Sequence, residues 1–278
     1  MRGFVDLHVH SHFSDGTLSP TQLVEKAAQT RLDAIALTDH NTVAGLPEFL
    51  CAGESQNIRA VAGVEISAGY RGKEVHIVGL FLKLEVWDRV TDYLAVLNDR
   101  KTQSNRDLVR RLKEAGYEVD LEQLLQNAQG TVNRAVIAAK MLEKGYVSSV
   151  KEAFKGLLSE KNGYYVPPQR LDAFEVIAFL KSVDAVSVLA HPYLSLEENE
   201  IRAFVPEAKA HGLVAMETRY STYTPEITEA AIRLAKEFGI MESGGSDFHG
   251  ENKPDIQLGI GRGALCVPAM LMDKLLEG

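Results

Sequence analysis

The sequence predicts an α/β barrel that is interrupted by an inserted helical subdomain. Apolar strand-like runs alternate with helical segments toward both ends of the chain, and about seven such runs favour a parallel barrel over an open sheet. Between them, from about residue 86 to residue 158, the strand signal is weak and the pattern is helical. We therefore expect barrel segments at 1–97 and 164–278 and a helical subdomain at 98–163.

The predicted strands are short apolar runs, several of which end in polar residues. Their lengths are typical of buried strands, and the helical segments between them supply the crossovers of a parallel sheet. In chain order the runs are 4–10, 32–38, 60–67, 75–82, 185–190, 213–218 and 239–245.

The predicted helices are delimited by capping residues. Ser19, Pro20 and Gln22 form a helix start with an N-cap, a proline in the first turn and a capping box. A long, basic helix over 97–116 ends at Gly116, a residue typical of helix ends. Further helices are expected at 43–56, 121–127, 132–144, 149–158, 171–182, 198–211, 225–238 and 268–276.

Composition places the chain among ordinary globular proteins. Of 278 residues, 45% are hydrophobic and 24% charged, which excludes a disordered, collagen-like or coiled-coil protein. No apolar run approaches the roughly 18–20 residues of a membrane helix, and the first residues lack a secretory signal. Cys51 and Cys266 are too few for a disulfide framework or a thiolate zinc site. We expect a cytoplasmic protein without a membrane partner, and no protein partner is indicated.

Charge is distributed unevenly along the chain. The net charge is −8, which argues against a generally basic nucleic-acid-binding surface. Residues 98–161 contain 12 Lys and Arg against 9 Asp and Glu, a local net charge of +3. This asymmetry supports the assignment of the middle of the chain as a separate subdomain.

Histidines and carboxylates recur at the carboxyl ends of the predicted strands. In an α/β barrel these ends converge on one face, where functional sites are built. The residues are His8, His10, His40 and His191 at strand ends, His249 just after one, and Asp15, Glu65 and Asp247 in equivalent places. Five imidazoles and three carboxylates are therefore expected to meet in one bowl.

Such a cluster points to divalent cations. Neighbouring carboxylates repel, and without cations at least one would take up a proton. Imidazole and carboxylate ligands together suit zinc, manganese or iron. Three dications would bring about +6 against −3 from the carboxylates, so the bowl would attract a phosphate within an acidic protein.

Taken singly, these residues also have ordinary structural explanations. Asp15 lies in a Ser-Asp-Gly turn sequence, and Asp6 either orients a ligand or merely ends a strand. Glu65 favours a functional role because a buried, unpaired carboxylate is costly inside an apolar strand. Spacing alone leaves His76 ambiguous, and His12 is a candidate substrate contact outside the periodic pattern.

Six segments in chain order resemble the PHP (polymerase and histidinol phosphatase) metal-dependent phosphoesterases. They are DLHVHSHFSDGTLSP, ALTDHNTVAGL, AGVEIS, VHIVGL, VLAHP and SGGSDFHG. The resemblance spans nearly the whole chain and is nearest to bacterial nucleoside 3′,5′-bisphosphate phosphatases and related 5′-to-3′ exoribonucleases. It implies a distorted (β/α)7 barrel with a small inserted helical subdomain and a trinuclear metal centre, with manganese expected and iron or zinc also compatible.

The resemblance also implies roles for individual residues. The metal ligands would be His8, His10, Glu65 and Asp247 on the first ion, Glu65, His76 and His191 on the second, and Asp15, His40 and His249 on the third. Asp15, Glu65, His191 and Asp247 would be catalytic, and His12 is kept as a substrate contact. Arg134 is a candidate phosphate ligand, although Val136 replaces a histidine that is usual in this branch.

The expected activity is hydrolysis of phosphate esters of small nucleotides by a metal-bridging hydroxide. The substrate implied first is the 3′-phosphate of nucleoside 3′,5′-bisphosphates. Alternatives are a histidinol-phosphate phosphatase, a 5′-3′ exoribonuclease acting on short RNA, and a metal-stabilised binding module without activity. The open bowl argues against the last, because structural zinc sites are usually closed four-coordinate sets.

Overall fold

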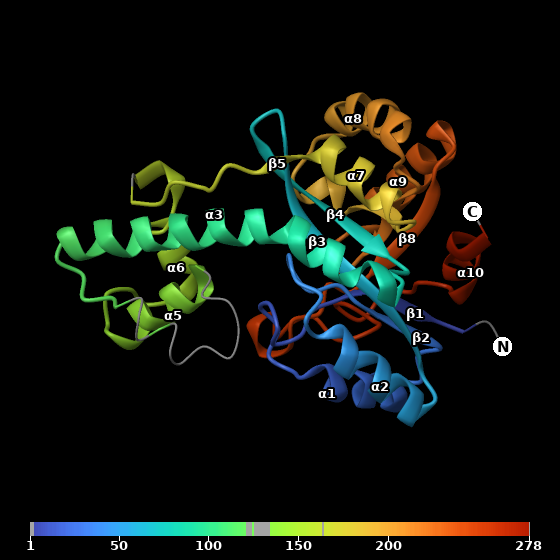
Figure 1. Cartoon of the computed structure of the whole chain (residues 1–278), viewed down its shortest axis with the longest axis horizontal. Coiled ribbons are helices and arrows are strands. Elements are labelled where there is room, and N and C mark those ends of the chain that lie inside the picture. Colours follow the sequence, from blue (N-terminus) through green and yellow to red (C-terminus); the bar gives the residue numbers. More distant parts are fainter. Residues whose placement is uncertain (1–2, 121–123, 125–133, 163, 278) are drawn as a thin grey trace. The chain divides into compact units, whose positions relative to one another are not determined.

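The computed structural model describes residues 3–120, 124, 134–162 and 164–277, and the chain divides into two compact units (Figure 1). The barrel unit comprises residues 1–91 and 170–278, and the helical unit comprises residues 92–169. The expected subdomain at 98–163 falls within the helical unit.

Seven strands of the barrel unit form one nearly closed sheet in the order β1-β2-β3-β4-β6-β7-β8. Their bounds are β1 Val5–Val9, β2 Ala34–Leu37, β3 Arg59–Tyr70, β4 Lys73–Leu80, β6 Val186–Ala190, β7 Ala215–Tyr220 and β8 Met241–Gly245, with the short β5 Leu171–Asp172 paired to β3. A bridge between Val9 and Phe248 and a 2.8 Å hydrogen bond from Asp247 N to His8 O bring the two edges together. The predicted distorted barrel is confirmed.

One strand runs against the direction of the others. β4 is antiparallel to both β3 and β6, so the expectation of parallel strands is wrong at this position. The reason is the connection: only Arg71 and Gly72 separate β3 from β4, and both have positive φ, at 48° and 79°. Such a turn joins antiparallel strands, whereas a parallel pair needs a crossover of a dozen or more residues.

Helices lie outside the sheet, with α1 and α2 next to β2 and β3 and α7 to α9 beside the later strands (Figure 1). Their bounds are α1 Pro20–Gln29, α2 Leu46–Gln56, α7 Ala173–Ser182, α8 Glu198–His211 and α9 Pro225–Phe238. The predicted capping box of α1 is confirmed: Ser19 Oγ accepts from Gln22 N at 3.1 Å, and Gln22 Oε1 accepts from Ser19 N at 2.9 Å. No helix in the described ranges is long and apolar enough to cross a bilayer.

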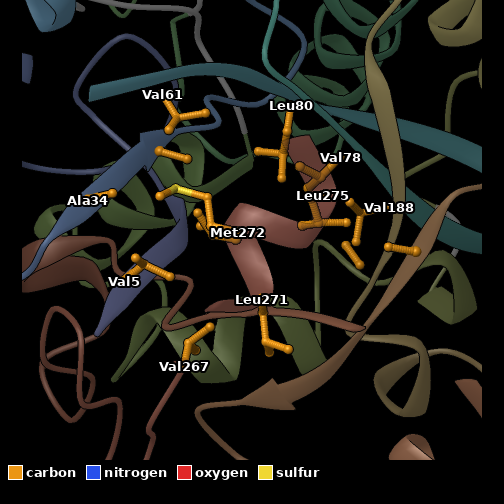
Figure 2. Close-up of a cluster of buried hydrophobic side chains, with 14 residues drawn as sticks. Val5, Ala34, Val61, Val78, Leu80, Val188, Val267, Leu271, Met272 and Leu275 are labelled. Carbon is orange, nitrogen blue, oxygen red and sulfur yellow. The ribbon is translucent and has the colours of Figure 1, made fainter. Parts of the chain in front are cut away.

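The core of the barrel is completed by the last helix, α10 Ala269–Glu277. Leu271, Met272 and Leu275 of this helix pack with Val5 and Ala34, among other apolar strand residues (Figure 2). Val5 and Ala34 are the first residues of β1 and β2, so α10 closes the amino-terminal end of the barrel. The carboxyl-terminal end is left for polar side chains.

The helical unit has a hydrophobic core of its own. The helices α3 Trp87–Glu114, which starts in the barrel unit, α5 Arg134–Glu143 and α6 Val150–Lys155 contribute to this unit. Its buried residues include Leu108, Leu112, Ile137 and Met141. α3 begins ten residues before the predicted start at 97 because the amphipathic pattern extends back to Trp87. The expected helix at 121–127 lies outside the described residues, apart from position 124.

Candidate metal centre

All nine residues named as metal ligands lie together at the carboxyl-terminal end of the barrel. Strand ends and the loops after them position most of these side chains, while antiparallel β4 brings His76 to the same place. They are His8, His10, Asp15, His40, Glu65, His76, His191, Asp247 and His249. Six of the nine are buried, and Asp15, with a side chain 30% exposed, is the most exposed of them.

Glu65 is the centre of this arrangement. Its Oε1 lies 2.8 Å from His76 Nδ1 and 3.0 Å from His191 Nε2. Its Oε2 lies 3.0 to 3.2 Å from a ring nitrogen of each of three further histidines, namely His8, His10 and His40. One fully buried carboxylate therefore contacts five imidazoles that come from four strands or their ends.

Donor atoms from these residues form three groups, in each of which they lie within 4.8 Å of one another. The groups are His8, His10, Glu65 and Asp247; His40, Glu65 and His76; and His10, Asp15, His40 and His249. The first group is identical to the ligand set that the family resemblance implies for the first metal. The third group contains the set implied for the third metal and, in addition, His10. The second contains His40 where the resemblance implies His191. Which ion each residue binds stays a prediction.

Two buried atoms show that the cluster suits cations rather than hydrogen bonds. His40 Nδ1 and Glu65 Oε2 are 3.0 Å apart, and neither has a hydrogen-bond partner among the described residues. Buried polar atoms without a partner are costly, so their convergence indicates a shared ligand. Imidazole nitrogens with carboxylate oxygens are a donor set that zinc, manganese or iron accept.

The carboxylates of the cluster are held in their ionised form. Burial acts to raise the pKa of Glu65, but the charges of His40, His8 and His76 outweigh it and hold this pKa well below its usual range. Burial likewise opposes ionisation of Asp247, yet its hydrogen bond with His10 and neighbouring charges leave its pKa well below the usual range. Both groups are thus negative at neutral pH and ready to bind cations.

The pKa values of two imidazoles in the cluster are raised, whereas that of a third is lowered. Burial acts to lower the pKa of His10, but its close contacts with the carboxylates of Asp247 and Glu65 raise that pKa to about 9. Burial is likewise outweighed at His76, where attraction to Glu65 raises the pKa to about 10. At His40 burial prevails and lowers the pKa. Protons at His10 and His76 therefore neutralise the carboxylates until metal ions displace them.

Buried carboxylates outside the donor groups hold the loops that carry the cluster. Asp39 Oδ1 accepts from Ser11 N and Ser14 Oγ, both at 2.7 Å, which fixes the loop before Asp15. Asp6 accepts from Ser246 N at 2.8 Å and from Ser246 Oγ at 2.5 Å, which fixes the residue before Asp247. Asp6 thus contacts residues next to candidate ligands, and its role in orienting a ligand stays a prediction.

Three further residues contact the cluster, and two of them, Glu217 and Lys253, were not singled out from the sequence. Asp247 Oδ2 lies 2.6 Å from both Tyr220 Oη and Lys253 Nζ. Glu217, in β7, lies 2.8 Å from His8 Nδ1. A signal for Glu217 existed, since it is a carboxylate inside an apolar strand, as Glu65 is. Nothing in the local pattern around Lys253 distinguishes it from a surface lysine.

The two residues expected to contact substrate each have ring contacts within their own unit. His12 belongs to none of the three donor groups, and its ring stacks on Phe13 with centroids 4.8 Å apart. Arg134 is in the helical unit, where its guanidinium carbon lies 3.9 Å from the ring centroid of Tyr165 and 5.5 Å from that of Phe154. Both assignments stay predictions.

Comparisons with known proteins bear on this site. The family model described as "PHP domain" matches residues 6–168. A 5′-3′ exoribonuclease of Haemophilus influenzae is 33% identical over 88% of this chain and 89% of its own length. A 3′,5′-nucleoside bisphosphate phosphatase of Chromobacterium violaceum is 26% identical over 91% of this chain and 90% of its own length. A solved structure from Bifidobacterium adolescentis is described as a metal-dependent phosphoesterase. It superposes with a TM-score of 0.86 and is 27% identical in sequence, and the match covers 99% of this chain and 96% of the solved chain.

The barrel, its histidine–carboxylate cluster and these similarities together define a metal-dependent phosphoester hydrolase. Within that class the chain belongs to the PHP domain family. The resemblance drawn from the six sequence segments is confirmed, as is the expectation of an enzyme.

Proposed function

We propose that this enzyme hydrolyses phosphate esters of small nucleotides, with the 3′-phosphate of nucleoside 3′,5′-bisphosphates as its substrate. The observation that supports this most directly is the position of Glu65 between five imidazoles at an open end of the barrel. The relative from Chromobacterium violaceum carries the same activity in its name.

The chain supplies the ligands for such chemistry. When bound, divalent cations provide an ionised water for attack on phosphorus and neutralise charge on the phosphoryl oxygens. Glu65 faces imidazoles with both of its oxygens, which supports the proposal that it would hold two cations. The more exposed side chains are those of Asp15, His40 and His76, at 30%, 18% and 20%, whereas His8 and His10 are fully buried. The substrate phosphate therefore approaches from the side of Asp15, His40 and His76.

A 5′-3′ exoribonuclease acting on short RNA is the second candidate, because a relative with that name has 33% identity over most of both chains. The two activities share much of their chemistry. A 5′-phosphorylated RNA and a nucleoside 3′,5′-bisphosphate both place a 3′ phosphoester next to a 5′ phosphate. They differ in whether the 3′ phosphate carries a further nucleotide, which keeps that phosphate after hydrolysis.

A substrate comparison separates these candidates. The chelator-treated enzyme, reloaded with manganese, is given adenosine 3′,5′-bisphosphate, histidinol phosphate and 5′-phosphorylated oligoribonucleotides of increasing length. We expect the highest kcat/KM for the bisphosphate, with phosphate and 5′-AMP as products. A higher kcat/KM for oligonucleotides beyond dinucleotides selects the exoribonuclease instead, and preference for histidinol phosphate contradicts both nucleotide proposals.

The metal content and location belong to the same proposal. We expect three manganese ions per chain, which elemental analysis of protein purified without chelators measures directly.

We also expect the enzyme to act in the cytoplasm, since Cys51 and Cys266 are both free and exposed, as in proteins of reducing compartments.

A further inference from the structure

The buried carboxylate of Glu217 connects two of the candidate ligands without belonging to any of the donor groups. Glu217 is in β7 and is 1% exposed. Its Oε1 lies 2.8 Å from His8 Nδ1, and its Oε2 accepts a 2.6 Å hydrogen bond from the backbone N–H of His191. Each oxygen thus has its own partner, one from β1 and one from the end of β6.

The contact with His8 decides which ring nitrogen is free to bind a metal. Glu217 Oε2 already accepts from the His191 N–H, and as a carboxylate its Oε1 would accept from His8 Nδ1 in the same way. The lone pair of the neutral ring is then on Nε2. That nitrogen faces the first donor group, at 3.2 Å from Glu65 Oε2 and 3.1 Å from His10 Nε2. A carboxylate behind a metal-binding imidazole fixes both its tautomer and its orientation.

The contact with His191 holds a strained backbone. His191 has φ 28° and ψ 53°, a left-handed conformation that is unfavourable for a residue with a Cβ. In this conformation its ring reaches the cluster, with Nε2 3.0 Å from Glu65 Oε1. The hydrogen bond from the His191 backbone to Glu217 Oε2 helps to offset this cost.

We propose that Glu217 is a positioning residue of the metal centre, whose two oxygens fix the ligand tautomer of His8 and the backbone of His191 at the same time. This role requires that a single carboxylate offers two hydrogen-bond acceptors at a fixed separation. This inference rests on the metal centre and is independent of which phosphate ester is cleaved.

Glu217→Gln tests the requirement for two acceptors, because an amide offers one acceptor and one donor in nearly the same shape. If the amide oxygen accepts from the His191 N–H, the NH2 group faces His8 Nδ1 and favours the tautomer with the proton on Nε2. If the oxygen faces His8 instead, the NH2 group opposes the His191 N–H. In either orientation one ligand is mispositioned.

The measurement is metal affinity, determined without substrate by competition with a chromophoric chelator for manganese and for zinc. We expect Glu217→Gln to weaken binding by about 10- to 100-fold, the usual effect of removing such a partner. Turnover at low manganese falls in parallel and recovers in part as manganese is raised. Because affinity is measured without substrate, the result stands whether or not the proposed substrate is correct.

Glu242→Gln is the matched control. Glu242 is a glutamate of the neighbouring strand β8 that contacts Thr218 and Arg219 and belongs to none of the donor groups. We expect it to keep the parent metal affinity. Thermal unfolding of the metal-free proteins shows whether each variant folds, and a folded Glu217→Gln protein with parent affinity overturns the proposal.

A second measurement requires no variant. In the zinc-loaded parent labelled with 15N-histidine, long-range 1H–15N correlation spectra report which nitrogen of His8 carries the proton. We expect a protonated Nδ1 and a metal-bound Nε2. Coordination through Nδ1 contradicts the proposal, including the case in which Glu217→Gln does not fold.

Discussion

At the scale of single residues, Glu65 combines the features that make this site chemically active. It is fully buried, ionised and in contact with five imidazoles, and its Oε2 has no hydrogen-bond partner in the described part of the chain. A buried carboxylate is stable only with compensating charge. We expect metal ions to supply that charge in the active enzyme and protons on the imidazoles to supply it in their absence.

Replacing Glu65 with glutamine removes this charge with little change in shape. We expect Glu65→Gln to lower turnover by at least about 10²-fold, since a preorganised charged group at the reacting centre is lost. Elemental analysis should show fewer metal ions per chain. Glu54→Gln, at an exposed position of α2, is the control and should match the parent. Full metal content and turnover in Glu65→Gln would contradict the assignment.

The raised pKa values of His10 and His76, about 9 and about 10, predict how metal binding depends on pH. Both rings are protonated near pH 7 without metal, so binding releases protons and weakens as the pH falls. In the metal-free protein the same shifts stabilise the fold below the unfolded pKa of 6.5. That stabilisation is lost as the pH rises through 9 to 10.

Calorimetric titration with manganese in buffers of different ionisation enthalpy counts these protons. We expect net proton release at pH 7 and a smaller release at pH 9. A binding enthalpy that is the same in every buffer would show that no proton is displaced and would contradict the prediction.

Two roles of Arg134 can be tested separately. Its stacking on Tyr165 and Phe154 stabilises the helical unit, whereas a phosphate contact would affect substrate binding. We expect Arg134→Gln to raise KM at least about tenfold for adenosine 3′,5′-bisphosphate, since a charge-assisted hydrogen bond contributes about 1.5–3 kcal/mol. The KM for 3′-AMP, which has one phosphate, should change less. Equal changes for both substrates would indicate a purely structural role.

At the scale of elements, the contact between β1 and β8 sets the geometry of the site. A Cβ added at Gly245 of β8 would lie 2.4 Å from His8 Cβ and 2.5 Å from His8 N. Only glycine lets the backbones approach so closely, and this approach brings His8 and Asp247 into one donor group.

We therefore expect Gly245→Ala to destabilise the protein by about 1–3 kcal/mol in chemical denaturation, as overpacked cores do. Its metal affinity should fall as well because His8 is displaced. Gly69→Ala is the control. Gly69 lies near the end of β3, where an added Cβ would be 3.3 Å from the side chain of Arg170, a longer distance than those at Gly245. Parent-like stability of Gly245→Ala would show that the two strands separate at little cost.

The elements also differ in how well sequence predicts them. The limits of α8 and α9 agree with the predicted ranges because their caps, such as Thr224 and Gly239 of α9, are local signals. The direction of β4 was not predicted, since it depends on strand pairing across the sheet. The short β5 took two residues from a predicted helix, and Asp172 caps the helix that remains.

At the scale of the whole molecule, the donor groups bring together segments that are distant in sequence. Donors from β1 and from the residues after β8 belong to one group, although more than 200 residues separate them. A ligand that binds only the folded state stabilises it by mass action. Metal binding and folding of the barrel unit are therefore coupled.

Manganese at a hundredfold excess over its Kd should stabilise the chelator-treated protein by about 2.7 kcal/mol. For a chain of this size we expect a rise in Tm of about 5 °C or more. Differential scanning calorimetry measures it, with Glu65→Gln showing a smaller rise. An unchanged Tm in the parent at saturating manganese would contradict the coupling.

The sequence by itself determined the barrel class, the caps of several helices and the nine residues that gather at the carboxyl ends of the strands. These follow from periodicity, capping and motifs, which involve residues close together in the chain. Only the tertiary structure decided the direction of β4, the donor groups in which His40 takes part, and the contacts of Glu217 with His8 and His191. Those features depend on which distant side chains approach within a few ångströms, and strand pairing determines that approach.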